Sequence, residues 1–170
     1  MLATVNESPS KTTLFTHERK TLFLLGGSQG SLLLNNLLKI FITTNQQVSN
    51  SIQIIHQTGS YDTTNWKKFY ASAGIPAITF SYSHQIKDFY LLSDLVICRA
   101  GAGTLFELLF FKKHSIIIPL VAKTTDHQVE NARAMAAEHP DLFTIIEQKQ
   151  VEQNPTLLHT EIIRCLQLLR

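Results

Sequence analysis

The stretch Thr21-Leu-Phe-Leu-Leu-Gly-Gly-Ser-Gln-Gly-Ser31, continued by Leu32 to Phe41, decides the fold. The apolar run from Leu22 to Leu25 is typical of a strand buried on both faces, and the glycines behind it allow a sharp turn. Apolar residues then recur at the helical spacing i, i+3, i+4 and i+7, as Leu34, Leu37, Leu38 and Phe41. The pattern predicts a strand, a glycine turn and a helix packed back on the strand, with Ser28 as the helix cap.

A helix that begins directly after a glycine turn is a candidate anion site. Its first N–H groups have no partner inside the helix, and the positive end of the helix dipole lies beside them. A nucleotide pyrophosphate suits such a site, although the sequence is neither G-x-G-x-x-G nor a Walker A loop with its lysine. A tight turn without any ligand explains the turn equally well when it is considered alone.

The composition is that of an ordinary globular protein and argues against several functional classes. The 170 residues are 44% hydrophobic and 16% charged, which fits about one domain. A net charge of +2 without a long basic cluster argues against a nucleic-acid partner. The 2 cysteines and 7 scattered histidines lack disulfide or metal-ligand spacing, so we expect no metal and no other cofactor. No apolar run is long enough for a membrane span, and we expect a cytoplasmic protein.

Short apolar runs alternate with helical patterns from Thr21 onward. We expect later strands at 52–57, 77–82, 95–98, 115–120 and 143–147, and later helices at 65–73, 84–93, 104–111, 126–138 and 155–170. Residues 1–20 are rich in Ser, Thr and charge, and we expect a lead-in or linker that can be disordered, before a domain at 21–170. Strict alternation is typical of an α/β, doubly wound parallel sheet of about six strands, whose ligands bind at the carboxyl ends of the strands.

Two later loops at those carboxyl ends have an unusual composition. Arg99-Ala-Gly-Ala-Gly103 is a second glycine-rich turn before a helix, and in a parallel sheet it can face the first turn across one crevice. Glu107 follows Thr104 at the capping-box spacing, so it either closes the helix start, which spacing alone favours, or accepts hydrogen bonds from a ribose diol. Asp126-His-Gln128 opens another helix, where polar side chains can meet sugar hydroxyls or only solvent. His56, at a strand end, is more typical of a structural histidine than of a general base.

Four motifs follow one another along the chain. They are Leu25-Gly-Gly-Ser-Gln-Gly-Ser31 with Asn35, His56-Gln-Thr-Gly59, Asp94-Leu-Val-Ile-Cys-Arg-Ala-Gly-Ala-Gly-Thr104 with Glu107, and Asp126-His-Gln128 with Asn131 and Ala132. In this order and spacing, from about Thr21 to Gln148, they resemble the C-terminal half of the MurG glycosyltransferases, glycosyltransferase family 28. The resemblance implies one Rossmann-like half of the two-domain GT-B architecture, the half that holds the nucleotide-sugar donor.

The resemblance also implies a reaction. The family moves N-acetylglucosamine, with inversion, from UDP-N-acetylglucosamine to undecaprenyl-pyrophosphoryl-N-acetylmuramyl-pentapeptide, which converts lipid I to lipid II in peptidoglycan synthesis. We expect no catalytic residue and no activity in this domain alone, because the lipid-linked acceptor would be bound by an N-terminal domain or a partner chain. The intact enzyme would touch the membrane surface from the cytoplasm, peripheral to the inner face of the plasma membrane.

Carried over to this sequence, the resemblance implies a donor site. Gly27, Ser28 and Gln29 would face the pyrophosphate, and Glu107 would hold the ribose hydroxyls. Ala102, Gly103 and Thr104 would line the phosphate and sugar side, His127 and Gln128 would contact the hydroxyls of N-acetylglucosamine, and Tyr82, Ser83 and Ile86 would contact uracil. The loop at 82–86 departs from the F-x-D-x-M that is common in the family, which bears on base selectivity.

Two other functions remain open on the sequence. One is a stand-alone donor-half subunit of a lipid-linked N-acetylglucosaminyltransferase that needs a membrane-bound partner, since such a subunit also carries an A-G-A-G-T turn. The other is a non-catalytic nucleotide-binding module. The G-G-S-Q-G and H-Q-T-G motifs favour the bacterial enzyme over the first alternative.

Overall fold

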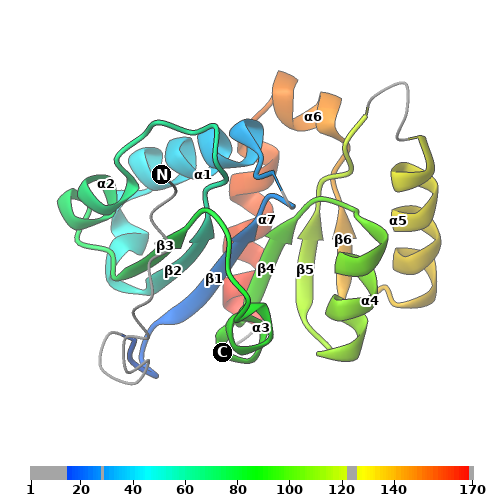
Figure 1. Ribbon diagram of the computed structural model, residues 1–170, viewed down its shortest axis with the longest axis horizontal. Coiled ribbons are helices and arrows are strands. Elements are labelled where there is room, and N and C mark those ends of the chain that lie inside the picture. The colour runs from blue at the N-terminus through cyan, green and yellow to red at the C-terminus, as the bar shows by residue number, and fades with distance from the viewer. Residues whose placement is uncertain (1–14, 28, 122–125, 169–170) are drawn as a thin grey trace.

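The structure is a computed structural model that describes residues 15–27, 29–121 and 126–168. Six strands form one sheet in the order β3-β2-β1-β4-β5-β6, and all neighbouring strands are parallel (Figure 1). The strands are β1 (Lys20–Leu25), β2 (Ile52–Gln57), β3 (Ala77–Phe80), β4 (Leu95–Cys98), β5 (His114–Ile117) and β6 (Phe143–Ile145). The predicted doubly wound parallel sheet is confirmed, and its strand order reverses direction between β1 and β4.

Helices cover both faces of the sheet (Figure 1). They are α1 (Leu32–Thr44), α2 (Trp66–Ser72), α3 (Ile86–Leu92), α4 (Ala102–Phe110), α5 (Asp126–Glu138), α6 (Gln148–Gln153) and α7 (Thr156–Leu168), with a 3-10 helix η1 (Gln46–Asn50). Buried residues of α1, α2, α6 and α7 pack on one face, and those of α3, α4 and α5 pack on the other. No described helix is both long enough and apolar enough to cross a membrane.

Successive strand residues enter opposite cores, which explains the uninterrupted apolar runs in the sequence. In β1, Leu22 and Leu24 join the core under α1, whereas Phe23 and Leu25 join the core under α3 and α4. All four side chains are at most 5% exposed.

The strand register brings the loops after the strands to one edge of the sheet. Leu25 pairs with both Gln57 and Cys98, Gln57 pairs with Phe80, and Cys98 pairs with Ile117. The segments that follow these residues therefore leave the sheet side by side, and they include both glycine turns. This is the edge at which ligands bind in doubly wound sheets.

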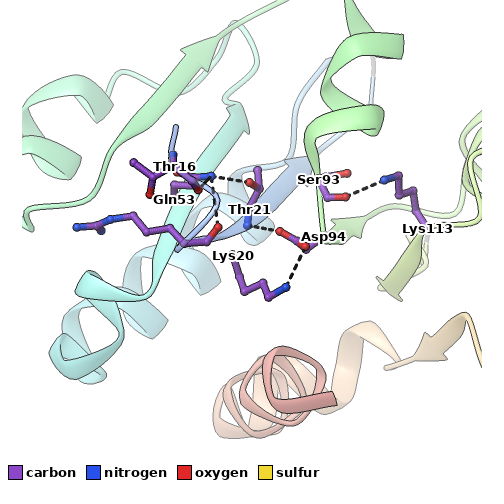
Figure 2. A network of polar contacts seen from close by, with 8 residues as sticks. Thr16, Lys20, Thr21, Gln53, Ser93, Asp94 and Lys113 are labelled. Carbon is purple, nitrogen blue, oxygen red and sulfur yellow. Dashed lines mark hydrogen bonds and ion pairs between the residues drawn. The ribbon is translucent and has the colours of Figure 1, made fainter. Parts of the chain in front are cut away.

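A polar network closes the opposite, amino-terminal edge (Figure 2). The Asp94 carboxylate accepts from the Thr21 backbone N–H at 2.8 Å and lies 3.4 Å from the Lys20 ammonium. The Gln53 side chain donates to Thr21 Oγ1 at 2.9 Å and accepts from the Thr16 N–H at 3.0 Å. These bonds tie the chain before β1 to β2 and β4, so residues just before the expected domain start at 21 are held against the sheet.

Several predicted element boundaries differ from the structure. Ser28 lies outside the described residues, and Ser31 caps α1 instead, because the turn extends through Gly30. The predicted helix start at Thr104 is wrong, since α4 begins at Ala102 after a Gly101 cap. Strands β3, β5 and β6 and helices α2 and α3 are shorter than expected, and η1 and α6 occupy segments for which neither a strand nor a helix was expected.

Candidate functional site

The first glycine turn is pressed against the loop that follows β2. Gly27 and Gly30 have φ values of +88° and +80°, and the Gly30 N–H donates to Gly27 O at 3.0 Å. A Cβ on Gly30 would lie 2.4 Å from Gly59 Cα, and one on Gly59, whose φ is +79°, would lie 2.4 Å from Gln29 O. The backbone here needs glycine both for its left-handed conformation and for its close approach.

Helices α1 and α4 both begin at the carboxyl edge, after the adjacent strands β1 and β4. The Ser31 hydroxyl accepts from the Leu34 N–H at 3.4 Å, which is a long capping bond. Gly101, the residue before α4, has no side chain with which to cap that helix. The first N–H groups of α4 therefore lack a side-chain partner, and an anion could accept from them.

Arg99, two residues before the Gly101 cap of α4, is hydrogen-bonded to the Ser31 cap of α1 and to the first residue of α6. Its Nε donates to Ser31 Oγ at 3.2 Å, and its Nη1 donates to Ile118 O at 3.1 Å and to Gln148 Oε1 at 2.9 Å. Burial lowers the pKa of Arg99, and the charge of Glu152 opposes this, but a guanidinium remains protonated. The guanidinium thus adds a fixed positive charge to the edge where two helix dipoles already favour an anion.

A series of hydrogen-bonded, mostly buried polar side chains packs against the first glycine turn and the loop after β2. His56 is fully buried, with Nε2 2.9 Å from Asn35 Oδ1 and Nδ1 2.8 Å from the Tyr70 hydroxyl. The Asn35 amide nitrogen donates to Thr58 O at 2.9 Å and to Asp62 Oδ2 at 2.7 Å, so the Asn35 oxygen accepts from His56. The His56 proton therefore lies on Nε2, and Tyr70 donates to Nδ1. This arrangement confirms His56 as a structural histidine.

Burial and charge shift the pKa values in this hydrogen-bonded group of residues in opposite directions. Desolvation lowers the pKa of His56 to about 3, although the Asp62 charge raises it, so the imidazole is neutral. Desolvation raises the pKa of Asp62, but hydrogen bonds from Thr64, Asn35 and Trp66 outweigh it and lower the pKa overall. The neutral His56 imidazole and the ionised Asp62 carboxylate both hold the Asn35 side chain, which also donates to Thr58 O. Asn35 lies one turn after Ser31, and Thr58 directly precedes Gly59, so these bonds connect the two loops.

Glu107 does not cap α4, so the cap interpretation of its spacing is wrong. Its exposed carboxylate accepts a hydrogen bond from the buried Tyr90 hydroxyl, with 2.9 Å between Tyr90 Oη and Glu107 Oε2. Glu107 lies beyond the first turn of a helix that begins at Ala102, which places it too far along the helix for a capping box.

The loop after β3 places its three predicted site residues in different environments. Tyr82 is 64% exposed, and its ring meets the His84 ring edge-on with 5.0 Å between centroids. Ser83 Oγ accepts from the Gln85 N–H at 3.0 Å, which fixes the loop locally. Ile86 packs on the core under α3. The side chains of Tyr82 and Ile86 thus differ in exposure, and uracil contact at this loop stays a prediction.

The start of α5 is tied to the loop after β5. Gln128 Oε1 accepts from the Leu120 N–H at 3.2 Å, while His127 is exposed. Asn131, one turn further on, and Ala102 of α4 both line a cavity of about 240 Å³ between the two helices. The remaining lining residues are Leu105, Phe106, Ala134, Met135 and Glu138. Because most of these lie along the helices and away from the glycine turns, the cavity is not the centre of the site.

Three residues that the structure brings to this site were not predicted. Arg99 stands directly before the second glycine turn, and that position was the available signal. Gln148 lies 49 residues from Arg99 in the sequence, and Tyr90 lies 17 residues from Glu107, so only the fold brings each pair together.

Comparisons with known proteins agree with this geometry. The model of the "Glycosyltransferase family 28 C-terminal domain" matches residues 21–167. A relative from Myxococcus xanthus, named UDP-N-acetylglucosamine--N-acetylmuramyl-(pentapeptide) pyrophosphoryl-undecaprenol N-acetylglucosamine transferase, is 39% identical over 70% of this chain and 31% of its own length. A relative of the same name from Campylobacter fetus is 35% identical over 86% of this chain and 42% of its own length.

A solved structure shows the same architecture. The crystal structure of Acinetobacter baumannii MurG matches with a TM-score of 0.72 and 25% identity, covering 88% of this chain and 42% of that chain. The fold is thus one Rossmann-like half of the GT-B architecture, and the chain spans between about a third and two fifths of the length of the curated relatives described above. The chain belongs to the glycosyltransferase family 28 C-terminal domain family.

Proposed function

We propose that this chain is the donor-binding half of an inverting N-acetylglucosaminyltransferase. Its donor is UDP-N-acetylglucosamine and its acceptor is undecaprenyl-pyrophosphoryl-N-acetylmuramyl-pentapeptide. The names of the relatives from Myxococcus xanthus and Campylobacter fetus support this reaction. The observation that carries the proposal is the pair of helix starts at adjacent strands, with Arg99, which precedes α4, hydrogen-bonded to the Ser31 cap of α1.

Each predicted site residue has a proposed role in holding the donor. Gly27, Ser28 and Gln29 face the pyrophosphate, together with Arg99. The other donor contacts are Ala102, Gly103 and Thr104 at the phosphates and sugar, Glu107 at the ribose, His127 and Gln128 at the N-acetylglucosamine hydroxyls, and Tyr82, Ser83 and Ile86 at the uracil. Gly27 suits its role because nothing lies within 4 Å of the place where its Cβ would be.

The chemistry proposed for this half is stabilisation of the leaving group. As the bond from the anomeric carbon to the phosphate oxygen breaks, negative charge grows on UDP. The helix N-termini and Arg99 are fixed donors, and their hydrogen bonds to UDP become stronger as this charge develops. The acceptor hydroxyl must lose its proton to a base within about 2.6–3.2 Å. We assign that base to the part of the relatives that this chain does not span.

The partners and location follow from the same proposal. Residues 21–170 form the donor domain, residues 1–20 lead into it, and an N-terminal domain or a partner chain binds the lipid-linked acceptor. The assembled enzyme works in the cytoplasm, peripheral to the inner face of the plasma membrane. No metal and no nucleic acid take part.

Titration calorimetry tests the proposal. We expect the chain to bind UDP and UDP-N-acetylglucosamine with dissociation constants in the micromolar to millimolar range, which corresponds to a binding free energy on the order of 4–8 kcal/mol. We expect ADP to bind more weakly. We also expect no transfer to a lipid-linked acceptor by the chain alone. Absence of binding at millimolar UDP, or equal binding of ADP, would contradict the donor assignment.

Arg99 offers a sharper test of the pyrophosphate contact. Arg99→Lys keeps the charge but loses the planar fork, and we expect UDP to bind about tenfold more weakly while uridine binding changes little. The control is Arg133→Lys, because Arg133 is an exposed arginine on α5 whose ion-pair partner is Glu147. We expect that variant to bind UDP like the wild type.

A further inference from the structure

Tyr90 is a buried tyrosine whose hydroxyl proton is directed at Glu107, a residue of the proposed donor site. Its side chain is fully buried on α3, and its hydroxyl donates to Glu107 Oε2 on α4 at 2.9 Å. This bond links two helices through side chains that are 17 residues apart.

Aromatic packing fixes the Tyr90 ring. The Phe23 ring meets it edge-on with centroids 5.5 Å apart, and the Phe111 ring stacks on it at 5.2 Å with an interplanar angle of 17°. A ring held between a strand residue and a helix end has no room to turn away. The position of the hydroxyl oxygen is therefore set by the core and not by Glu107.

The chemistry of the pair gives the bond one direction. Burial raises the pKa of Tyr90, and the neighbouring Cys98 and Glu107 raise it further, so the phenol keeps its proton and donates. The phenol donates to Oε2 of Glu107, and no residue that the structure describes donates to Oε1, so Oε1 can accept from a ligand. An exposed glutamate would otherwise sample several rotamers, and this bond selects among them.

We propose that Tyr90 is a positioning residue, which holds the Glu107 carboxylate in the orientation that accepts hydrogen bonds from the ribose hydroxyls. The inference rests on the proposed function, since it needs a ribose at Glu107. It also gives α3 a role, because Ile86 at the start of this helix adjoins the loop proposed for uracil and Tyr90 lies one turn further on. One helix thus connects the proposed base contact with the ribose contact.

The test compares UDP with 2′-deoxy-UDP and 3′-deoxy-UDP by calorimetry. In the wild type we expect loss of a contacted hydroxyl to weaken binding about tenfold, as for a hydrogen bond to a charged group. Tyr90→Phe keeps the ring and its packing but removes the hydroxyl. We expect this variant to bind UDP about fivefold more weakly and to discriminate less between UDP and the deoxy ligand.

A double-mutant cycle separates positioning from stability. If Tyr90 acts through Glu107, then Tyr90→Phe changes UDP affinity little in a Glu107→Gln background. Tyr70→Phe is the matched control, because it removes another buried hydroxyl, the one bonded to His56 on the opposite face of the sheet. We expect it to lower the melting temperature without changing the ratio of UDP to deoxy-ligand affinity.

The outcomes distinguish the two proposals. A wild-type chain that does not bind UDP overturns both the proposed function and the role of Tyr90. A wild-type chain that binds UDP and discriminates against a deoxy ligand, with the same discrimination in Tyr90→Phe, overturns only the role of Tyr90. Additive effects of the two substitutions would likewise show that Tyr90 does not act through Glu107.

Discussion

A histidine without access to water is held in its neutral form, and its hydrogen bonds then require one tautomer. His56 meets this condition between the Asn35 oxygen and the Tyr70 hydroxyl. Protonation would add a second N–H facing the Tyr70 oxygen and would place a charge in the core. The residue is therefore sensitive to acid although it is not proposed to touch the donor.

The first prediction concerns the pH dependence of stability. Below pH 6.5 the unfolded chain binds a proton at His56, whereas the folded chain binds it only near pH 3. The free energy of unfolding therefore decreases as the pH is lowered from 6.5 to 3. The slope should be on the order of 1.4 kcal/mol per pH unit. Urea denaturation at a series of pH values measures it.

His56→Gln provides the control for that slope. Its amide can still donate to Asn35, but it does not titrate, so we expect a less stable protein with a flatter profile between pH 6.5 and 4. The pKa of His159 is also lowered by burial, and its contribution is common to both proteins. Equal slopes in the wild type and the variant would exclude His56 as the source.

The second prediction concerns the close contact of the two glycine loops. Gly30→Ala and Gly74→Ala both place a side chain at positive φ, which costs about 1–2 kcal/mol. Only at Gly30 does the new Cβ also meet backbone, since nothing lies within 4 Å of that position at Gly74. We expect Gly30→Ala to lower the free energy of unfolding by at least about twice as much as Gly74→Ala, as measured in urea. Similar losses would mean that the loops can separate easily.

At single positions, the sequence indicated which residue types matter better than it indicated where their side chains lie and which groups they contact. The importance of the first glycine turn was predictable because its glycines interrupt an apolar run. Which serine caps α1 was not, because both Ser28 and Ser31 stand near a helix start and only the positive φ of Gly30 decides between them. For Glu107, the spacing favoured a cap, and the earlier start of α4 removes that interpretation.

Short elements can position a site even when they contribute little to the core. Helix α6 buries only Val151 among its residues, yet its first residue, Gln148, accepts from the Arg99 guanidinium. Its N-terminus has a capping box formed by Glu147 and Gln150, in which the Glu147 N–H donates to Gln150 Oε1 at 3.0 Å. The cap gives this six-residue helix a defined start and thereby a defined position for Gln148.

The third prediction follows from this contact. Gln148→Ala removes an acceptor that orients Arg99, and we expect UDP to bind about threefold more weakly while the melting temperature changes little. Gln153→Ala at the exposed end of α6 is the control and should bind UDP like the wild type. Unchanged affinity in Gln148→Ala would show that Ile118 and Ser31 suffice to orient Arg99.

Elements were predictable where burial shaped the sequence. The strands 52–57 and 95–98 and the helix 126–138 have the expected bounds, because apolar runs or clear helix starts mark them. Helix α6 was missed because its sequence, Gln148 to Gln153, is polar apart from Val151 and too short to show a helical period. Its structure depends on its cap and on contacts that become visible only in the fold.

Across the whole molecule, the two ends of the strands have different roles, since one carries the proposed binding site and the other carries a stabilising polar network. The carboxyl edge gathers glycine turns, uncapped N–H groups and Arg99, whereas the amino edge holds the paired polar network around Asp94 (Figure 2). Binding and stability should therefore respond separately to substitutions at opposite edges.

The fourth prediction tests this separation. Asp94→Ala removes the acceptor for the Thr21 N–H and the ion pair with Lys20, and we expect a loss of about 1–3 kcal/mol in stability with unchanged UDP affinity. Glu107→Gln should show the reverse, with weaker UDP binding and a nearly unchanged free energy of unfolding. Calorimetry and urea denaturation of the same two variants provide both measurements. A change in UDP affinity in Asp94→Ala would mean that the two edges are coupled.

The position of Trp66 gives the molecule a built-in optical reporter. It is the single tryptophan of the chain, its indole N–H donates to Asp62 at 3.0 Å, and its ring lies edge-on to His56 with 4.5 Å between centroids. All intrinsic indole emission therefore originates in the series of polar side chains that packs against the first glycine turn. A rearrangement of that turn on ligand binding should change the intensity or wavelength of this emission without any attached label.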